Sequence, residues 1–499
     1  MTNHRVAPPA TVVEVTADRL AEHAGQLLAD GSRLALVAAH HDPDAIRIVY
    51  LFTAGPPDRR TELHLRVDPD RPAVPSLAAL SFPASRFERE MHDLYGVRPE
   101  NHPLPRRLVR HPHWPHGWYP MRADAGPRPP LAASEPFPFV TVQGPGVYEI
   151  PVGPVHAGLI EPGHFRFSVV GETILKLKAR LWYVHKGIEK LFEGHPADQR
   201  VALAERASGD TAVGHALAYT LAVEDALNIA VPPHAQRARA ALLELERLHN
   251  HIADIGAICN DVGYGIANTH AQRIREQLLR LNHATTGHRL LRGGVFPGGA
   301  RLHTVPDPAT IHAIANDAAD VVDFALRQTI VRDRLTGTAT LSRQQAADIG
   351  TLGYVARASG LSFDARHAHP HTQLDDLTIP VHANGDVLAR FLVRADEIRT
   401  SAAILTALLP TLTAGTATSK RALPAPGRRA AGVGIVEGWR GTITHRVELN
   451  PDGTLTRAKI VDPSFFNWPA LPVALADTIV PDFPLTNKSF NLSYAGNDL

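Results

Sequence analysis

A succession of long helical segments restricts the fold of this chain more than any other feature. From residue 171 onward, apolar residues recur at helical spacing. The segments are 171–193, 211–230, 233–260, 268–291, 308–329, 342–358 and 386–414. Helices of this kind are stable when each buries an apolar face against its neighbours. The sequence therefore predicts a helical core of bundle type.

Strand-like segments flank these helices. The first, "GVYEIPVGPVHAGLIEPGHFRFSVV" (146–170), predicts two strands broken at Pro162-Gly163. The second, "RRAAGVGIVEGWRGTITHRVELNPDGTLTRAKIVD" (428–462), predicts strands joined by a turn that begins at Asn450. We expect the two ends of the helical region to form a small β element.

Residues 11 to about 96 follow a different pattern, with β-like runs after a helical start. The helical start is 18–29 and the β-like runs are 34–41, 46–54 and 61–67. A connector rich in Pro, His and Trp comes next, and such a composition does not sustain a helix. We expect an α+β N-terminal domain (1–110), a Pro/Trp-rich linker or wrapping arm (111–137) and a mainly α-helical domain with a small β element (138–499).

Composition excludes several classes of function. Lys+Arg number 51 and Asp+Glu 50, so a nucleic-acid partner has no electrostatic support. A single cysteine, Cys259, excludes an internal disulfide and any iron–sulfur or zinc site built on several thiolates of this chain. The sequence has neither a signal-peptide core nor a run of about 20 apolar residues. We therefore expect no direct membrane span, and membrane association only through partners.

Two charged segments each have an ordinary and a functional interpretation. "RFEREMHDLYGV" (86–97) predicts either a solvated helix with ion pairs or a docking edge that carries a partner subunit. In "LWYVHKGIEKL" (181–191), His185 and Glu189 are spaced four apart, as on one helical face. That pair is either a polar face or a proton relay, since two ligands alone do not make a metal site.

Two pairs of small polar residues have the same spacing. Ser208 and Thr211 follow Arg206, and Ser464 and Asn467 follow an Asp-Pro step. Taken singly, each pair is typical of a turn or a helix cap. The same spacing on both sides of the helical region raises the question of a shared ligand.

Blocks spread over nearly the whole chain resemble one family. "FPASRFEREMHDLYGV" and "NHPLPRRLVRHPHWPHGWYPMR" are similar to the C-type subunit of bacterial respiratory complex I. "GPVHAGLIEPGHFRF", "HKGIEKL", "HALAYTLAVE", "LLELERLHNHIADIGAI", "FPGGARL", "GYVARASG" and "GDVLARFLVR" resemble its D-type subunit. They resemble still more the large subunit of [NiFe] hydrogenases of the formate hydrogenlyase or hydrogenase-4 type (group 4), in which a fused C-like then D-like order is typical.

The chain departs from this family at the metal site. Active [NiFe] hydrogenases hold the two metals with four thiolates from two CxxC motifs, because soft thiolates stay deprotonated and bridge them. The resemblance places those positions at Ser208, Thr211, Ser464 and Asn467, whose neutral hydroxyls and amide are poor ligands for Ni(II). We therefore expect no [NiFe] centre, no hydrogenase activity and no cofactor bound by this chain alone.

The resemblance implies a first hypothesis, an oxidoreductase-complex subunit that binds quinone. In the D-type subunit the corresponding cavity receives a quinone headgroup, which meets a His and a Tyr. His156 matches the His, whereas the Tyr position falls on Gly209. The pocket would lie around His156, Arg206 and Asp210, with Asp210 available for proton uptake.

The same resemblance implies partners. We expect a small iron–sulfur subunit of the complex I B-type that carries the cluster, a ferredoxin-like subunit and antiporter-like membrane subunits. The chain would then be peripheral on the cytoplasmic side of the cell membrane. His185, Glu189 and Asp364 would relay protons linked to electron transfer.

The alternative is a non-catalytic structural subunit that couples a redox module to ion-translocating membrane subunits. A subunit that is no longer selected for catalytic activity is expected to lose residues such as the four thiolates and the Tyr. In that case Ser208 and Ser464 only fill space and cap turns.

The ligand positions generate a direct prediction. Elemental analysis of the purified protein is expected to find no stoichiometric nickel or iron, because hydroxyl and amide groups do not replace thiolates for these metals. Stoichiometric nickel and iron in this chain would contradict the assignment of the four positions.

Overall fold

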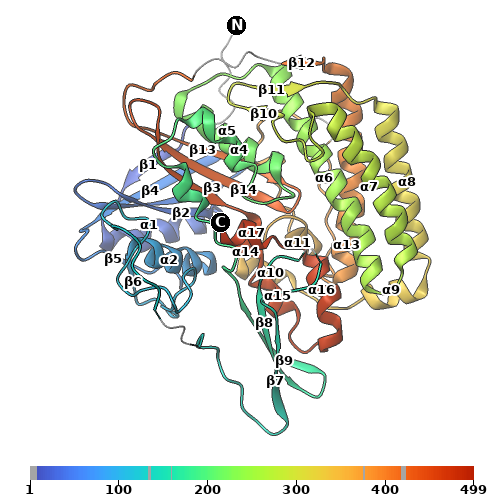
Figure 1. Ribbon diagram of the computed structural model, residues 1–499, viewed down its shortest axis with the longest axis horizontal. Helices are drawn as coiled ribbons and strands as arrows, with labels where there is room; N and C mark the ends of the chain where they lie inside the picture. The colour runs from blue at the N-terminus through green and yellow to red at the C-terminus, as the bar shows by residue number, and fades with distance from the viewer. Residues whose placement is uncertain (1–7, 133–135, 159, 375–376, 417–422) are drawn as a thin grey trace.

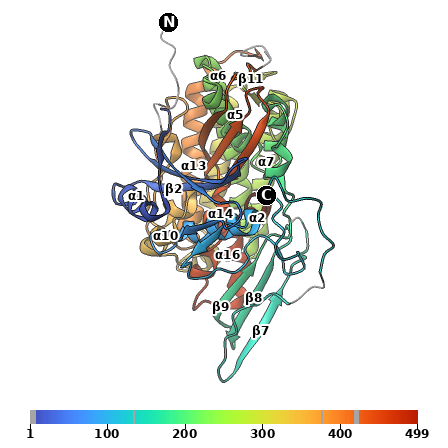
Figure 2. The same cartoon turned by 90° about the vertical axis from the view of Figure 1, so that its left-hand side faces the viewer.

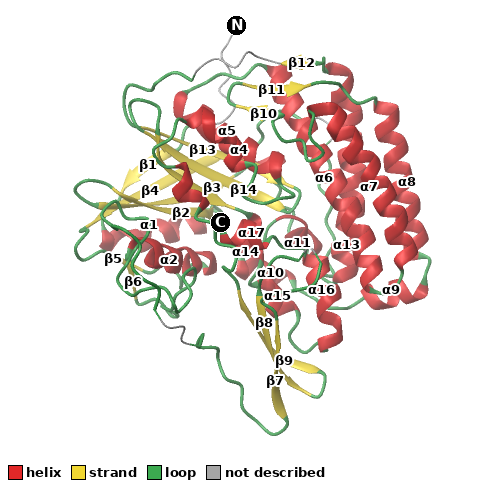
Figure 3. Ribbon diagram, in the orientation of Figure 1, coloured by secondary structure: helices red, strands yellow, loops and turns green. Residues whose placement is uncertain are grey.

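The computed structural model of the protein describes all residues except 1–7, 133–135, 159, 375–376 and 417–422. An N-terminal α+β part is followed by a mainly helical part with small sheets (Figure 1, Figure 3). This arrangement confirms the predicted fold class. Among the described residues, no helix is both long and apolar enough to cross a bilayer.

The N-terminal part is built on a four-stranded sheet with the order β1-β4-β3-β2. Strand β1 pairs parallel with β4, and the other neighbours are antiparallel. The elements are β1 (Thr11–Glu14), α1 (Ala17–Ala29), β2 (Arg33–His41), β3 (Ile46–Ala54), β4 (Arg59–Val67), β5 (Ala73–Pro75), α2 (Phe82–Tyr95) and β6 (Arg98–Glu100). The predicted helix and strands of this region are therefore confirmed.

Four long helices form the bundle that the periodicity predicts. They are α6 (Pro233–Asp261), α7 (Gly265–Thr286), α8 (Pro308–Leu326) and α13 (Val387–Leu408). Helix α6 contacts α7 and α13, and α8 contacts the same two helices, which closes the ring. The bundle lies to one side of the sheets (Figure 1), and apolar side chains such as Leu248, Ile274 and Phe391 form its hydrophobic core.

The predicted strands at both ends of this part exist, but they form two separate antiparallel sheets. One sheet contains β7 (Val147–Val152), β8 (His164–Val170) and β9 (Thr173–Arg180), and the other β13 (Ala430–Gly438), β14 (Gly441–Leu449) and β15 (Leu455–Val461). A third small sheet contains β10 (Val295–Phe296), β11 (Gly299–Leu302) and β12 (Gly415–Thr416). The β7–β9 sheet projects from the body in both views (Figure 1, Figure 2).

Short helices connect these units. They are α3 (Ile188–Phe192), α4 (Val201–Ala204), α5 (Ala212–Leu227), α9 (Thr329–Leu335), α10 (Arg343–Ile349), α11 (Gly353–Ala358), α12 (Ala365–Ala368), α14 (Pro463–Asn467), α15 (Ala470–Ala474), α16 (Phe483–Phe490) and α17 (Tyr494–Asp498). Single turns of 3₁₀ helix span Ala197–Arg200, Leu409–Thr411 and Val480–Asp482.

Two predicted helices are wrong in their extent. Segment 171–193 begins as strand β9, because Gly171 adopts φ +57° in a tight turn that folds the chain back on β8. Segment 342–358 is broken in two at Gly350, which ends α10 in the left-handed conformation with φ +77°. In both places a glycine backbone conformation overrides the side-chain pattern.

The charged segment 86–97 lies mostly in α2, and its acidic side chains point into the protein interior. The carboxylate of Glu88 accepts a hydrogen bond from the backbone N–H of Leu77 at 2.6 Å, and both Glu88 and Asp93 are fully buried. Glu90 pairs with Lys459 of β15 at 2.6 Å. The interpretation as a solvated helix is therefore wrong, since α2 fastens the N-terminal part to the C-terminal sheet.

Buried ion pairs join the N-terminal sheet to the C-terminal sheet. Arg446 of β14 contacts Glu62 of β4 at 2.8 Å, and Glu448 contacts Arg47 of β3 at 2.8 Å. Arg446 and Glu62 are 1% and 4% exposed. Such pairs fix register more than they add stability, because desolvation offsets most of the attraction. Charged side chains of both sheets therefore hold them against each other.

Helix α5 lies unusually close to β13. A Cβ atom added to Gly434 would stand 1.9 Å from the carbonyl oxygen of Ala218, and one added to Gly432 would stand 2.2 Å from that of Ala222. Only glycine permits this approach. The helix that follows Thr211 is thus fixed against the C-terminal sheet.

This contact predicts a strong effect of Gly434→Ala. The added methyl group would collide with backbone, so we expect the free energy of unfolding to fall by about 3 kcal/mol. Urea unfolding followed by circular dichroism measures it. The matched control is Gly25→Ala in α1, whose added Cβ meets nothing closer than 4.0 Å. Equal stability of the two variants would contradict the close approach.

Candidate functional site

Two turns distant in sequence meet through one serine. The Ser208 hydroxyl lies 2.8 Å from the hydroxyl of Ser493, whose backbone N–H donates to the Ser464 hydroxyl at 3.0 Å. Ser208 and Ser464 are 1% and 0% exposed. The turn before α5 and the start of α14 are therefore joined by the segment that leads into α17, beside α14 (Figure 1).

Thr211 is held from the other side by the hairpin between β13 and β14. Its hydroxyl accepts a hydrogen bond from the Trp439 indole at 3.1 Å and one from Arg440 Nη1 at 3.3 Å, and it donates to the Asp210 carboxylate at 3.2 Å. Both lone pairs and the proton of the hydroxyl are thus engaged.

Asn467 lies in the same region but has different partners. Its amide oxygen accepts from the N–H of Leu352 at 2.8 Å, and its amide nitrogen donates to the Leu352 carbonyl at 3.1 Å. Leu352 precedes Gly353, where an added Cβ would stand 2.0 Å from the Arg440 carbonyl oxygen. The amide therefore anchors the start of α11 beside the hairpin.

A guanidinium occupies the centre of this arrangement. Arg440 contacts the two carboxylate oxygens of Asp210 at 2.5 and 2.7 Å and donates from Nε to the Asn491 carbonyl at 2.6 Å. It also lies 3.9 Å over the ring of Trp439. Burial by itself would raise the pKa of Asp210, but Arg440 outweighs it and lowers the pKa to about 2.

The donor set does not fit the [NiFe] centre that the fold family implies. All four side chains at the ligand positions are engaged with protein groups, and the guanidinium of Arg440 lies against one of them, Thr211. Cys259 is buried in α6, and burial raises the pKa of its thiol to about 12. Within the described ranges, no group of three or more His, Cys, Asp or Glu residues could hold a metal.

A buried carboxylate–imidazole chain adjoins the same turns. Asp462, the N-cap of α14, lies 3.0 Å from Nε2 of His215, and Nδ1 of His215 lies 3.0 Å from Nε2 of His445. All three residues are buried, and burial lowers the pKa of His445 well below its usual value. Such a chain is able to hold or pass a proton. His445 lies 230 positions from His215, so no sequence pattern indicates the contact.

The residues of the predicted quinone pocket are spread out. His156 lies in the loop between β7 and β8, half-buried, with Nε2 2.8 Å from the Gly163 carbonyl oxygen. Arg206 and Gly209 are exposed. Asp210 is turned toward Arg440. No contact between these groups and His156 is found in the described structure.

The placement of His185 and Glu189 on one helical face is wrong. Gly187, with φ +68°, separates them, and α3 begins only at Ile188. His185 is exposed and lies 2.6 Å from the backbone carbonyl of Asp498, whereas Glu189 is buried.

Glu189 and Asp364 each belong to a buried ion cluster of its own. Glu189 contacts Arg457 at 2.7 Å, and Asp364 contacts Arg366 at 2.8 Å. Burial would raise the pKa of both carboxyls, but the neighbouring guanidinium groups outweigh burial and lower both. Both groups therefore stay ionised near neutral pH.

Three parts of the chain match known protein families. Residues 13–130 match the family described as respiratory-chain NADH dehydrogenase, 30 Kd subunit, and residues 261–432 match the 49 Kd subunit. Residues 186–255 match the nickel-dependent hydrogenase family.

Individual relatives cover most of the chain. The chain is 32% identical over 449 residues to formate hydrogenlyase subunit 5 of Escherichia coli K12, covering 87% of this chain and 79% of the relative. It is 33% identical to hydrogenase-4 component G of the same organism, covering 87% and 77%. The fused C/D-type protein of NADH-quinone oxidoreductase from Phocaeicola vulgatus is 31% identical, with 69% and 71% covered.

A solved structure has the same fold. A chain of the membrane-bound sulfane sulfur reductase, an archaeal respiratory membrane complex, superposes with a TM-score of 0.64 at 25% identity, covering 71% of this chain and 99% of that chain. The order of the matched parts and the identities confirm the resemblance read from the motifs. The chain belongs to the family of fused complex I 30 kDa/49 kDa (C/D-type) subunits that includes formate hydrogenlyase subunit 5 and hydrogenase-4 component G.

Proposed function

We propose that this chain is a peripheral subunit of a membrane-associated oxidoreductase complex of the complex I or formate hydrogenlyase type, in which it is a non-catalytic coupling subunit. Its relatives are named as subunits or components of such enzymes, and the matched solved chain comes from a respiratory membrane complex. The proposed partners are a small iron–sulfur subunit of the B-type, a ferredoxin-like subunit and antiporter-like membrane subunits, on the cytoplasmic side.

The observation that carries the proposal is that the chain's own side chains close the cradle, by which we mean the four positions Ser208, Thr211, Ser464 and Asn467. Ser493 bridges Ser208 and Ser464, and the Arg440–Asp210 pair closes the side toward Thr211. A ligand placed there would have to break the ion pair and leave the buried guanidinium of Arg440 without its partner, which is costly. Side chains that are already fully paired favour a mechanical role over a catalytic one.

Quinone binding is the second candidate, and the loop between β7 and β8 favours it. Beside half-buried His156, Val155 is 82% exposed and Ile160 44% exposed. An apolar edge of this kind fits a partner subunit or a hydrophobic ligand. Under this candidate, Arg206 and Asp210 complete the pocket.

Quinone binding ranks second because the charge state of its proposed proton relay does not suit proton uptake. The relay would run through His185, Glu189 and Asp364. The lowered pKa values of Asp210, Glu189 and Asp364 disfavour proton uptake at neutral pH. Relay through these groups would need a change of their ion pairs.

The experiment that tests the proposal uses the assembled complex. His156→Ala combined with Arg206→Ala is expected to leave assembly and turnover within about twofold of wild type, because a coupling subunit makes no chemical use of either side chain. Turnover is measured with quinone and with an artificial acceptor. The matched control is His312→Ala with Arg280→Ala, two exposed residues of α8 and α7.

A loss of turnover confined to the His156/Arg206 variant and to quinone would overturn the coupling role in favour of quinone binding. Loss of assembly in that variant, with the control intact, would place the loop at a subunit interface and also contradict the expectation.

The closed cradle generates a second prediction, for Arg440→Met. Asp210 loses its cation, so we expect the free energy of unfolding at pH 7 to fall by about 1–2 kcal/mol, a value reduced because the Asp210 side chain is 41% exposed. The matched control is Arg280→Met, which breaks an exposed pair with Glu276 and should leave the free energy of unfolding nearly unchanged.

The sign of the pH dependence follows from the lowered pKa of Asp210. Its folded value of about 2 lies below the unfolded value of about 3.9, so the pair stabilises above pH 4 and loses this contribution as pH falls toward 2. Arg440→Met lacks that contribution. Urea unfolding at pH 7, 5 and 3 should therefore show the two proteins converging as pH falls, and a constant difference would contradict the pairing.

A further inference from the structure

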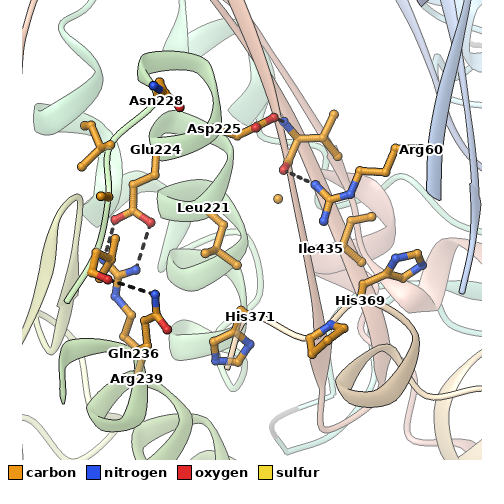
Figure 4. A pocket seen from close by; sticks show the side chains of 16 residues that line it. Arg60, Leu221, Glu224, Asp225, Asn228, Gln236, Arg239, His369, His371 and Ile435 are labelled. Carbon is orange, nitrogen blue, oxygen red and sulfur yellow. Dashed lines mark hydrogen bonds and ion pairs between the residues drawn. The ribbon is translucent and has the colours of Figure 1, made fainter. Parts of the chain in front are cut away.

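A cavity of about 150 Å³ lies between α5, β13 and the loop after α12, away from the cradle. Figure 4 shows Leu221 of α5 on one side and Ile435 of β13 on the other, with His371 below Leu221 and His369 beside Ile435. Its mouth is marked by the exposed residue Asn228. A space of this size holds a single six-membered ring.

The walls combine aliphatic surface with charges that are already neutralised. Arg239 donates to both carboxylate oxygens of Glu224 at 3.0 and 2.6 Å, as the dashed lines in Figure 4 mark. Arg60 lies 2.9 Å from the Asp58 carboxylate and donates to the Val433 carbonyl oxygen at 2.8 Å. These groups shape the cavity but offer no unpaired charge, so an anionic ligand has no counter-ion here.

Two imidazoles in the wall have unsatisfied nitrogens. His369 is 2% exposed; its Nδ1 lies 2.7 Å from the Asp58 carboxylate, and its Nε2 has no partner. His371 is 7% exposed, and its Nε2 also has no partner within the described chain. A buried polar atom without a partner is costly, and natural structures usually satisfy it with a ligand or water.

The protonation state of both imidazoles follows from their burial. Burial lowers the pKa of His369 and lowers that of His371 to about 4. Both rings are therefore neutral at pH 7, and His369, which donates from Nδ1, presents a lone pair at Nε2.

We propose that this cavity binds a small neutral ring compound of the phenol class, whose hydroxyl donates a hydrogen bond to an unpaired imidazole nitrogen of His371 or His369. The ring fills the space between Leu221 and Ile435, and the hydroxyl satisfies the buried acceptor. Neither the cradle nor a partner subunit is needed for this binding.

The test uses the purified full chain and three probes of equal ring size. Isothermal titration calorimetry is expected to give phenol a Kd of about 1 mM or below. Benzene, which lacks the donor, should bind at least tenfold more weakly, and benzoate should not bind because its charge finds no free cation. No binding of phenol, or equal binding of benzene, would overturn the proposal.

His371→Leu and His369→Leu, made separately, distinguish the hydrogen bond from the cavity itself. Each variant keeps the volume but removes one imidazole, so phenol affinity should fall at least tenfold in one of the two while benzene affinity is retained; unchanged phenol affinity in both would overturn the proposal. His312→Leu on the surface of α8 is the matched control and should bind phenol like the wild type.

A readout on the unmodified protein keeps the proposal testable if His371→Leu does not fold. In protein labelled with nitrogen-15 at histidine, saturating phenol should shift a ring-nitrogen resonance of His371 or His369 and leave that of His312 unchanged. Absence of any shift at both buried histidines would contradict the assignment.

Discussion

The ion pair between Arg440 and Asp210 is the interaction on which the centre of this structure depends. Arg440 lies in the tight hairpin between β13 and β14, and it binds the turn before α5 and the Asn491 carbonyl in the segment after α16. The carbonyl of the same residue faces Gly353 at the start of α11. One guanidinium thus connects three chain segments, because its planar group of donors reaches several acceptors at once.

The small polar residues around this pair have a structural role of their own. Where a thiolate cradle would present four anionic ligands to a metal, Ser208 and Ser464 instead share the bridge through Ser493, and Asn467 holds backbone. Each group is satisfied inside the protein. The side chains at these positions are thus occupied by hydrogen bonds within the chain, and this arrangement supports the coupling role that we propose.

Much of the fold is predictable because its signals are local. The bundle helices, such as α6 over Pro233–Asp261, follow from apolar periodicity sustained over many turns. The prediction fails at the beginning of β9, because Gly171 reverses the chain just before a segment that also suits a helix. The same limit applies to His185 and Glu189, where the left-handed Gly187 breaks the helical spacing.

The site is only partly predictable. Equal spacing and the resemblance to the family indicate Ser208 and Ser464, but nothing local indicates that Ser493 joins them. The bond between His215 and His445, and the pairing of Asp210 with a residue 230 positions away, depend on how the C-terminal sheet packs against α5. Contacts of this kind arise from tertiary packing and have no periodic pattern in the sequence.

The central claim is that the cradle is closed by the chain's own side chains. The most direct measurement is a cryo-electron microscopy structure of the assembled complex, frozen with excess quinone. We expect Arg440 within hydrogen-bonding distance of Asp210, and Ser493 bridging Ser208 and Ser464. Density for a metal or a quinone headgroup between these side chains, with the pair broken, would contradict it.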